Sequence, residues 1–204
     1  MNTLFAVPAA HVQGRAVTRV AIVFFSATGT TAALAEAVRA GAAEVAEAVS
    51  CPIAADDIVG GRFRNEGVLA AADAADGLAF GSPTYMGGPA AQFKAFADAT
   101  GDRWAERRWA DKVAAGFTTG SSPNGDQEHT LSYFAVLAAQ HGMLWCGLDI
   151  PGGHDPEGRN RLGAQLGVAA HAIADGAPDP SDLATARHLG RRLALVAGRT
   201  RSLG

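Results

Sequence analysis

The chain has few cysteines, few lysines and no long hydrophobic segment. Its two cysteines, Cys51 and Cys146, are far apart and have no histidine or further thiol at metal-ligand spacing, so we expect neither a disulfide framework nor a metal site. No apolar run approaches the roughly 20 residues of a membrane-spanning helix, and residues 1–17 lack the basic start and apolar core of a signal peptide. These absences predict a cytoplasmic protein without membrane insertion.

Positive charge is not in excess. The 17 basic residues, of which only Lys94 and Lys112 are lysines, face 20 acidic residues, and the formal net charge is -3. This balance provides no basic field for a nucleic-acid backbone, so nucleic acid is not expected as a partner. With 204 residues, 48% of them hydrophobic, the chain can bury one core, and we place a single domain at residues 18–204 after an extension over 1–17.

Strands and helices are predicted to alternate. The apolar stretch 19–25 is typical of a strand buried on both faces, and residues 30–48 show helical spacing of apolar side chains. Further strands are predicted near 49–54, 77–81, 112–117 and 143–150, and further helices near 68–74, 89–99, 127–141 and 181–196. The alternation predicts an α/β fold with a doubly wound, five-stranded parallel sheet and helices on both faces. Residues 151–180 are expected to be loops.

Three unusual loops follow predicted strands, where such sheets bind ligands. The first consists of Ser26, Ala27, Thr28, Gly29, Thr30 and Thr31. Its amides and hydroxyls can donate to phosphate oxygens, and the following helix adds a partial positive charge, so no lysine is required. The chain lacks a nucleotide P-loop, a three-glycine dinucleotide motif and a loop cysteine here, which favours the phosphate of FMN. A capped helix start without ligand is the alternative.

The second loop combines a rigid proline, bulky side chains and glycine. Its candidate residues are Pro83, Thr84, Tyr85, Met86 and Gly87. The backbone can approach a flat ring at the glycine, while Tyr85 and Met86 can pack against that ring. The alternative is a strand-to-helix turn with Tyr85 in the core.

The third loop is rich in short hydrogen-bond donors. Its candidate residues are Thr118, Thr119, Gly120, Ser121 and Ser122. Donors aimed at the pyrimidine edge of a flavin stabilise the negative charge of the reduced ring.

Taken together, these segments resemble the flavodoxin-like NAD(P)H:quinone oxidoreductases historically called tryptophan-repressor-binding proteins. The resemblance runs from about residue 20 to 148. It is carried by Ser26 to Thr31, Gly81 to Thr84, Gln92 to Phe96, Asp98, Thr100-Gly101, Trp104, Phe117 to Gly120, Gln127-Glu128 and His141 to Met143. It implies a flavodoxin-like fold, FMN as cofactor, NADH or NADPH as electron donor and a quinone-like acceptor.

The resemblance also implies residue roles. Residues 26–31 would hold the FMN phosphate, and residues 84–86 and 118–122 would line the isoalloxazine. His141 would reach the active-site side of the flavin as the catalytic residue, bonding the acceptor oxygen or protonating it, and Trp104 would border the substrate pocket. A helix-capping His141 and a Trp104 that anchors the core or a subunit contact are the alternatives.

The chain departs from the family in all three loops, and the third carries an extra residue around Ser122 to Asn124. Ala27 replaces an aromatic that contacts the nicotinamide nucleotide, and Tyr85-Met86 replaces an Arg-Phe pair. The expected function is FMN-dependent electron transfer from NAD(P)H to a quinone. The alternatives are a flavodoxin-type electron carrier between proteins and a flavin-free interaction protein. A homo-oligomer, dimer or tetramer, is implied because family members build the pocket partly from neighbouring subunits.

Overall fold

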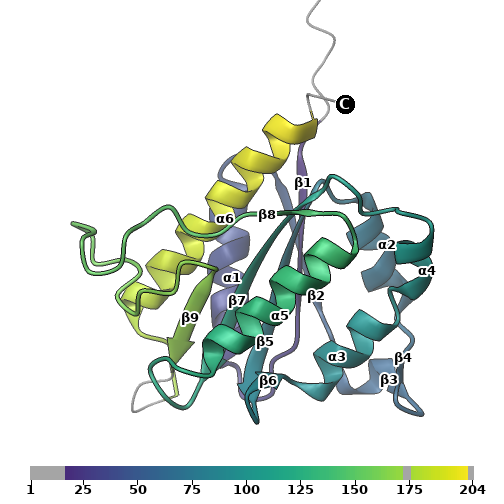
Figure 1. The fold of residues 1–204 in the computed structure, drawn as a ribbon, viewed down its shortest axis with the longest axis horizontal. Helices are drawn as coiled ribbons and strands as arrows, with labels where there is room; N and C mark the ends of the chain where they lie inside the picture. The colour runs from purple at the N-terminus through teal and green to yellow at the C-terminus, as the bar shows by residue number, and fades with distance from the viewer. Residues whose placement is uncertain (1–16, 172–175, 202–204) are drawn as a thin grey trace, which may run out of the picture.

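A computed structural model describes residues 17–171 and 176–201, arranged around one parallel sheet (Figure 1). Residues 1–16, which make up almost all of the expected extension, lie outside the described residues. The main strands are β1 (Arg19–Phe24), β2 (Glu47–Pro52), β5 (Gly77–Tyr85), β7 (Val113–Gly120), β8 (Leu144–Trp145) and β9 (Val168–His171). Their order is β2-β1-β5-β7-β8, with β9 also paired to β7. The chain therefore reverses its winding direction between β1 and β5, which is where ligands bind in such sheets.

The fifth strand position is divided between two segments. β8 pairs with the start of β7, at Val113 and Ala114, whereas β9 pairs with its end, from Phe117 to Gly120. The predicted strand over 143–150 is therefore wrong beyond Trp145, and the expectation that 151–180 contains only loops is wrong at β9.

Residues 147–167 leave the sheet because they bond to one another and to Thr185, which lies outside the sheet. Leu148 N donates to Gln165 O at 2.9 Å, which turns the chain away from β7. The buried Asn160 anchors the excursion, since its side chain donates to Ile150 O at 2.8 Å and its backbone N–H donates to Thr185 Oγ1 at 2.8 Å. The sequence pattern contains no signal for these bonds between distant segments.

Helices α1 (Thr30–Ala43) and α6 (Pro180–Thr200) cover one face of the sheet. Their backbones touch at two glycines. A Cβ on Gly41 would lie 1.8 Å from Arg187 O, and one on Gly190 would lie 1.9 Å from Val38 O. The close approach seals a core that includes Leu34, Leu189 and Leu193.

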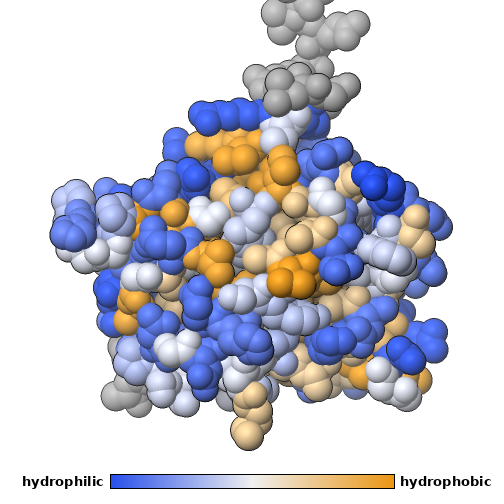
Figure 2. All heavy atoms as spheres, viewed as in Figure 1, coloured by the Kyte–Doolittle hydropathy of each residue, from blue (hydrophilic) through white to orange (hydrophobic). Residues whose placement is uncertain are grey.

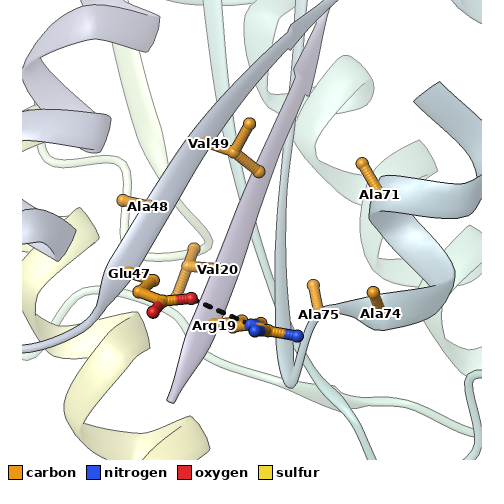
Figure 3. A pocket seen from close by; sticks show the side chains of 8 residues that line it. All are labelled: Arg19, Val20, Glu47, Ala48, Val49, Ala71, Ala74 and Ala75. Atoms are coloured by element: carbon orange, nitrogen blue, oxygen red, sulfur yellow. Dashed lines mark hydrogen bonds and ion pairs between the residues drawn. The ribbon is translucent and has the colours of Figure 1, made fainter. Parts of the chain in front are cut away.

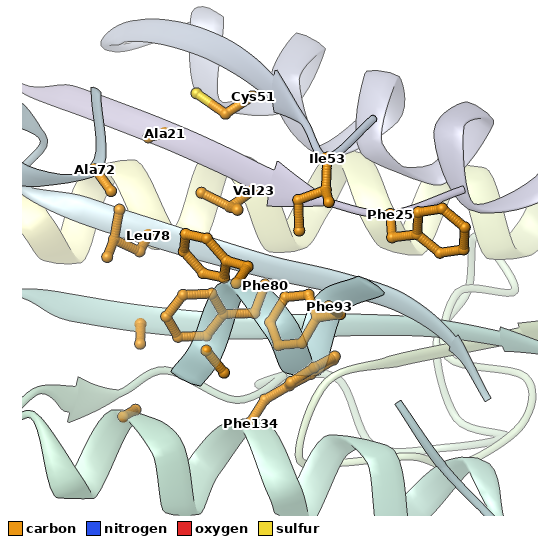
Figure 4. Close-up of a cluster of buried hydrophobic side chains, with 14 of the residues drawn as sticks. Ala21, Val23, Phe25, Cys51, Ile53, Ala72, Leu78, Phe80, Phe93 and Phe134 are labelled. Atoms are coloured by element: carbon orange, nitrogen blue, oxygen red, sulfur yellow. The ribbon is translucent and has the colours of Figure 1, made fainter. Parts of the chain in front are cut away.

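The other face packs an aromatic core under α2 (Glu66–Ala74), α3 (Ala91–Asp98) and α5 (Gln127–Gln140). Figure 4 shows Phe80 from the sheet beside Phe93 and Phe134 from two of these helices. The Phe93 and Phe134 ring centroids are 4.7 Å apart. Helices on both faces confirm the predicted layers.

Short elements complete the described chain. They are η1 (Ala55–Asp57), β3 (Ile58–Val59), β4 (Arg62–Phe63), β6 (Gly88–Pro89) and α4 (Gly101–Ala105). The helix predicted from residue 89 begins at Ala91, because Gly88 and Pro89 pair antiparallel with the end of β5. Every described helix is too short or too polar to cross a bilayer. Both cysteines are buried and free, and burial raises the pKa of the Cys51 thiol to about 11.

Candidate functional site

The three loops meet at one edge of the sheet. They follow β1, β5 and β7, which are parallel neighbours, and the register pairs Phe24 with Gly81 and Pro83 with Thr119. In Figure 1 this edge lies at the bottom of the view, where β5, β6 and β9 end. The prediction that these loops gather is therefore confirmed.

The first loop is shaped by the Ser26 hydroxyl. Its Oγ accepts hydrogen bonds from Gly29 N at 3.2 Å and Ala32 N at 3.1 Å. Gly29 has φ +98°, a conformation that suits glycine, and it precedes the first residue of α1. A hydroxyl that accepts two N–H groups still has its own proton to donate. With Ala27 and Thr28 exposed, the loop presents a neutral donor rim at a helix N-terminus.

Two threonines of this loop hold the surrounding structure. Thr31 is buried, and its hydroxyl lies 2.8 Å from that of Thr119, so it joins the first loop to the third. Thr30 donates to Gly176 O at 3.0 Å, which places that residue beside the first loop. The two side chains support the rim, and the exposed part of the loop faces outward.

The second and third loops are joined in the same way. Thr118 is fully buried and donates to Ser82 O at 2.7 Å. Thr84 Oγ1 lies 2.9 Å from Thr118 Oγ1 and 2.8 Å from Thr130 Oγ1. Loops 26–31, 83–88 and 118–125 contain no charged residue, so hydroxyls and backbone amides dominate the chemistry of this edge.

The second loop is a tight hairpin, not a turn into a helix. Met86 has φ +48° and Gly87 φ +80°, as a two-residue turn with both central residues left-handed requires. Tyr85 is 48% exposed and Met86 fully exposed, so the alternative of a core Tyr85 is wrong. The turn projects from the molecule in Figure 2, at the lower edge, and His129 Nδ1 is hydrogen-bonded to Gly87 O.

A cavity of about 210 Å³ opens between the second and third loops. It is lined by Thr84, Met86, Gly87, Gly120, Ser121, Ser122, Asn124, Asp126 and Gln127. Six of these nine residues belong to the predicted cofactor set. The sequence predicted no role for Gln127, although Gln127-Glu128 is one of the segments that carry the family resemblance and directly follows the third loop, at the start of α5.

His141 lies away from these loops. It caps the C-terminal end of α5, which spans 14 residues, so roughly 20 Å of helix separates it from the third loop. Its Nε2 lies 2.9 Å from Thr100 Oγ1, and its ring centroid lies 4.5 Å from that of Trp109. Within one chain, His141 does not meet the site formed by the loops.

The protonation of His141 follows from these contacts. Thr100 Oγ1 donates its proton to Ala97 O at 2.7 Å, so it accepts from the histidine, and Nε2 carries the ring proton. Nδ1 is then an acceptor, and it is buried without a partner among the described residues. Burial lowers the pKa of His141, which favours this neutral form. His141 is therefore arranged to accept a hydrogen bond at Nδ1 rather than to protonate an acceptor.

Trp104 and His141 share a different cavity, of about 510 Å³. Its lining is Trp104, Ala105, Arg107, Ala139, Gln140, His141 and Gly142. Trp104 is 54% exposed on α4, so it does not anchor the core. The structure brings the two residues together, at the opposite end of α5 from the loops.

A further cavity, of about 300 Å³, contains none of the candidate residues (Figure 3). It lies between β2 and α2, and alanines and valines make up most of its wall. The ion pair between Arg19 Nε and Glu47 Oε2, at 2.9 Å, borders it. Such a lining offers no group for redox chemistry, and its one cation, Arg19, is paired with Glu47.

Comparison with known families gives a match over most of the sheet. Residues 19–148 match the family model described as NADPH-dependent FMN reductase. Flavodoxin FldP of Pseudomonas aeruginosa is 37% identical, over 86% of this chain and 94% of that protein. An NAD(P)H dehydrogenase (quinone) of Archaeoglobus fulgidus is 35% identical, over 88% of this chain and 97% of that protein.

Solved structures agree on the fold. A flavodoxin described as a WrbA-like protein from Agrobacterium tumefaciens is 40% identical, with a TM-score of 0.70 over 89% of this chain and 98% of that one. Oxidised flavodoxin 2 from Bacillus cereus, at 17% identity and a TM-score of 0.58, shares the fold alone. The predicted flavodoxin-like fold is confirmed.

Proposed function

The chain belongs to the NADPH-dependent FMN reductase family, and from this premise we propose that it is an FMN-dependent oxidoreductase that passes electrons from NAD(P)H to a quinone or a similar small acceptor. Relatives named NAD(P)H dehydrogenase (quinone) match it over nearly their whole length, which supports this activity. The observation that carries the proposal is the edge where three loops without charged residues are joined by threonine hydroxyls.

The loop chemistry fits FMN. The first loop offers hydroxyls, amides and a helix N-terminus to a phosphate monoester, without a lysine or arginine. The cavity between the other two loops offers short donors beside the unpartnered oxygen of Gln127, which suits the mixed donor and acceptor edge of a flavin. When bound, FMN supplies the electron transfer.

The residues of this chain then have distinct tasks. Ser26 to Gly29 bind the phosphate, and Thr84 to Gly87 with Gly120 to Ser122 orient the ring. Thr31, Thr118 and Thr119 hold the loops in register. Short donors of the third loop, at the start of α5, stabilise negative charge on the reduced ring.

A second copy of the chain completes the acceptor pocket in this proposal. Trp104 and His141 line one cavity on the far side from the loops of their own chain, so they act on the site of a neighbour. The apolar wall of Trp104 borders the acceptor, and His141 accepts a hydrogen bond at Nδ1. Oligomeric state, cytoplasmic location and the choice between NADH and NADPH stay predictions.

Absorption spectroscopy tests the proposal. Protein reconstituted with FMN is passed through gel filtration and mixed with NADH or NADPH without oxygen. Retained flavin absorbance that is lost rapidly and returns when benzoquinone is added is the expected result. Protein that retains no flavin would contradict the proposal.

A one-electron carrier between proteins is the second candidate, favoured by the 37% identity to a protein named flavodoxin. In that case the flavin is retained but neither NADH nor NADPH reduces it within minutes. A flavodoxin reductase added with NADPH then reduces it, which separates the two candidates.

A further inference from the structure

Gln127 is a buried side chain with an unused acceptor. It is 2% exposed, and its Oε1 has no hydrogen-bond partner in the described part of the chain. Among the described residues, the only other buried side-chain atom in this state is His141 Nδ1. Buried polar atoms without partners are rare, and they often mark sites that a ligand completes.

The orientation of the Gln127 amide is fixed by its surroundings. Nε2 donates to Ser122 O, so a flip of the amide would place two oxygens against each other. The side chain also crosses the face of Gly120, where a Cβ would lie 2.7 Å from Nε2. Oε1 is therefore held as the acceptor of this group.

The position of Gln127 links this acceptor to the loops. It lines the cavity of about 210 Å³, together with Thr84 and Gly87 from the second loop and Ser121 from the third. The wall provides hydroxyl and backbone donors, and its other side-chain acceptors are the exposed carboxylate of Asp126 and the amide of Asn124. Asn124 is directed elsewhere, because its Nδ2 donates to Leu162 O at 2.7 Å.

The pyrimidine edge of a flavin carries the kind of donor that Gln127 Oε1 lacks. The pyrimidine ring of oxidised flavin carries one N–H, at N3, between two carbonyls. An acceptor flanked by donors is complementary to that pattern. We propose that Gln127 binds the flavin, with Oε1 accepting the N3–H and Nε2 keeping Ser122 in place.

This inference rests on the proposed function, because it requires FMN at the loops. It also requires part of the cavity wall to move, because Gln127 Oε1 is shielded from solvent and the flavin N–H has to reach it. Ser121 and Asn124 are exposed and line the cavity, so they can move as the ring enters while Ser122 stays bonded to Gln127 Nε2.

The test measures the affinity of apoprotein for FMN and for 3-deaza-FMN, in which a C–H replaces the N3–H. Wild-type protein is expected to bind FMN about tenfold more tightly, the value of one hydrogen bond. Gln127→Met removes the acceptor at similar size, and its two dissociation constants should agree within about twofold. Binding is followed by quenching of flavin fluorescence, independently of turnover.

Two further variants complete the design. Gln127→Leu also removes the acceptor at similar size and should likewise lose the preference for FMN, which keeps the test available if the methionine variant does not fold. Gln92→Met, in α3 and outside the cavity, is the matched control and should behave as wild type. Equal preference in wild type and Gln127→Met, or no preference in wild type, would overturn the inference. Wild-type protein that binds FMN and reacts with NAD(P)H despite that result would leave the proposed function standing.

Discussion

At the scale of single residues, His141 carries a pH dependence that can be measured. Burial lowers its pKa in the folded protein, whereas the unfolded chain has a value near 6.5. Above that value both states are neutral and folding is unaffected. As the pH falls below about 6.5, the unfolded chain takes up the proton first, so the folded state loses stability.

His141→Gln should reduce this loss. Glutamine can donate to Thr100 from its own amide but does not titrate. We expect the free energy of unfolding of the variant, measured in urea at pH 7.5, 6.5 and 5.5, to fall less steeply than that of wild type. Parallel curves for the two proteins would show that His141 does not contribute to the pH dependence.

The predicted site residues fall into two groups, those that face outward and those whose hydroxyls hold the loops together. Thr31, Thr118 and Thr119 were predicted as cofactor contacts from composition, and their buried hydroxyls are bonded to other loops. Composition identifies hydroxyls near a ligand but not the direction in which each one points. That direction depends on bonds between residues 31 and 119, which no local pattern contains.

At the scale of elements, the contact between α1 and α6 fixes the layer on one face of the sheet. Gly190→Ala would place a Cβ 1.9 Å from the backbone oxygen of Val38, an atom that cannot rotate away. The helices must then separate, and we expect the free energy of unfolding to fall by about 3 kcal/mol.

Thermal and urea unfolding measure this effect against a matched glycine. Gly101 begins α4, and a Cβ there would meet nothing within 4 Å, so Gly101→Ala should change stability by less than about 0.5 kcal/mol. Similar stability of the two variants would show that α1 and α6 tolerate a wider spacing.

Strand positions were predicted better than strand ends. The apolar runs of β1, β5 and β7 are continuous because both faces of these strands are covered, and they were found from residue 19, 77 and 112 onward. β9 was missed, since its four residues follow a stretch rich in Gly, Pro and Asp. Its pairing with β7 completes the sheet, and that pairing is not local in sequence.

At the scale of the whole molecule, the separation of Trp104 and His141 from the loops predicts shared sites. One variant, Trp104→Ala, damages the acceptor pocket, and another, Thr28→Glu, repels the phosphate at the exposed first loop. Each variant alone should be nearly inactive. Mixed oligomers that carry both should recover activity, to about half of wild type in a two-fold pair, because one site then has two intact contributors.

Differently tagged chains that are coexpressed and purified on both tags provide the mixed oligomer. Quinone reduction per protein chain is the readout, and each variant mixed with itself is the control. Mixed oligomers that stay inactive would show that a site does not combine residues from two copies.

The sequence by itself determined the alternation of strands and helices, the three loops at the carboxyl ends of the strands and the absence of charge in the first of them, because each depends on side chains adjacent along the chain. Only the tertiary structure decided that β8 and β9 share one position, that three of the predicted threonines face inward, that Gln127 has an unused oxygen and that His141 lies at the far end of α5. These features arise from packing between residues far apart in the chain, where direction and distance are set by the whole fold.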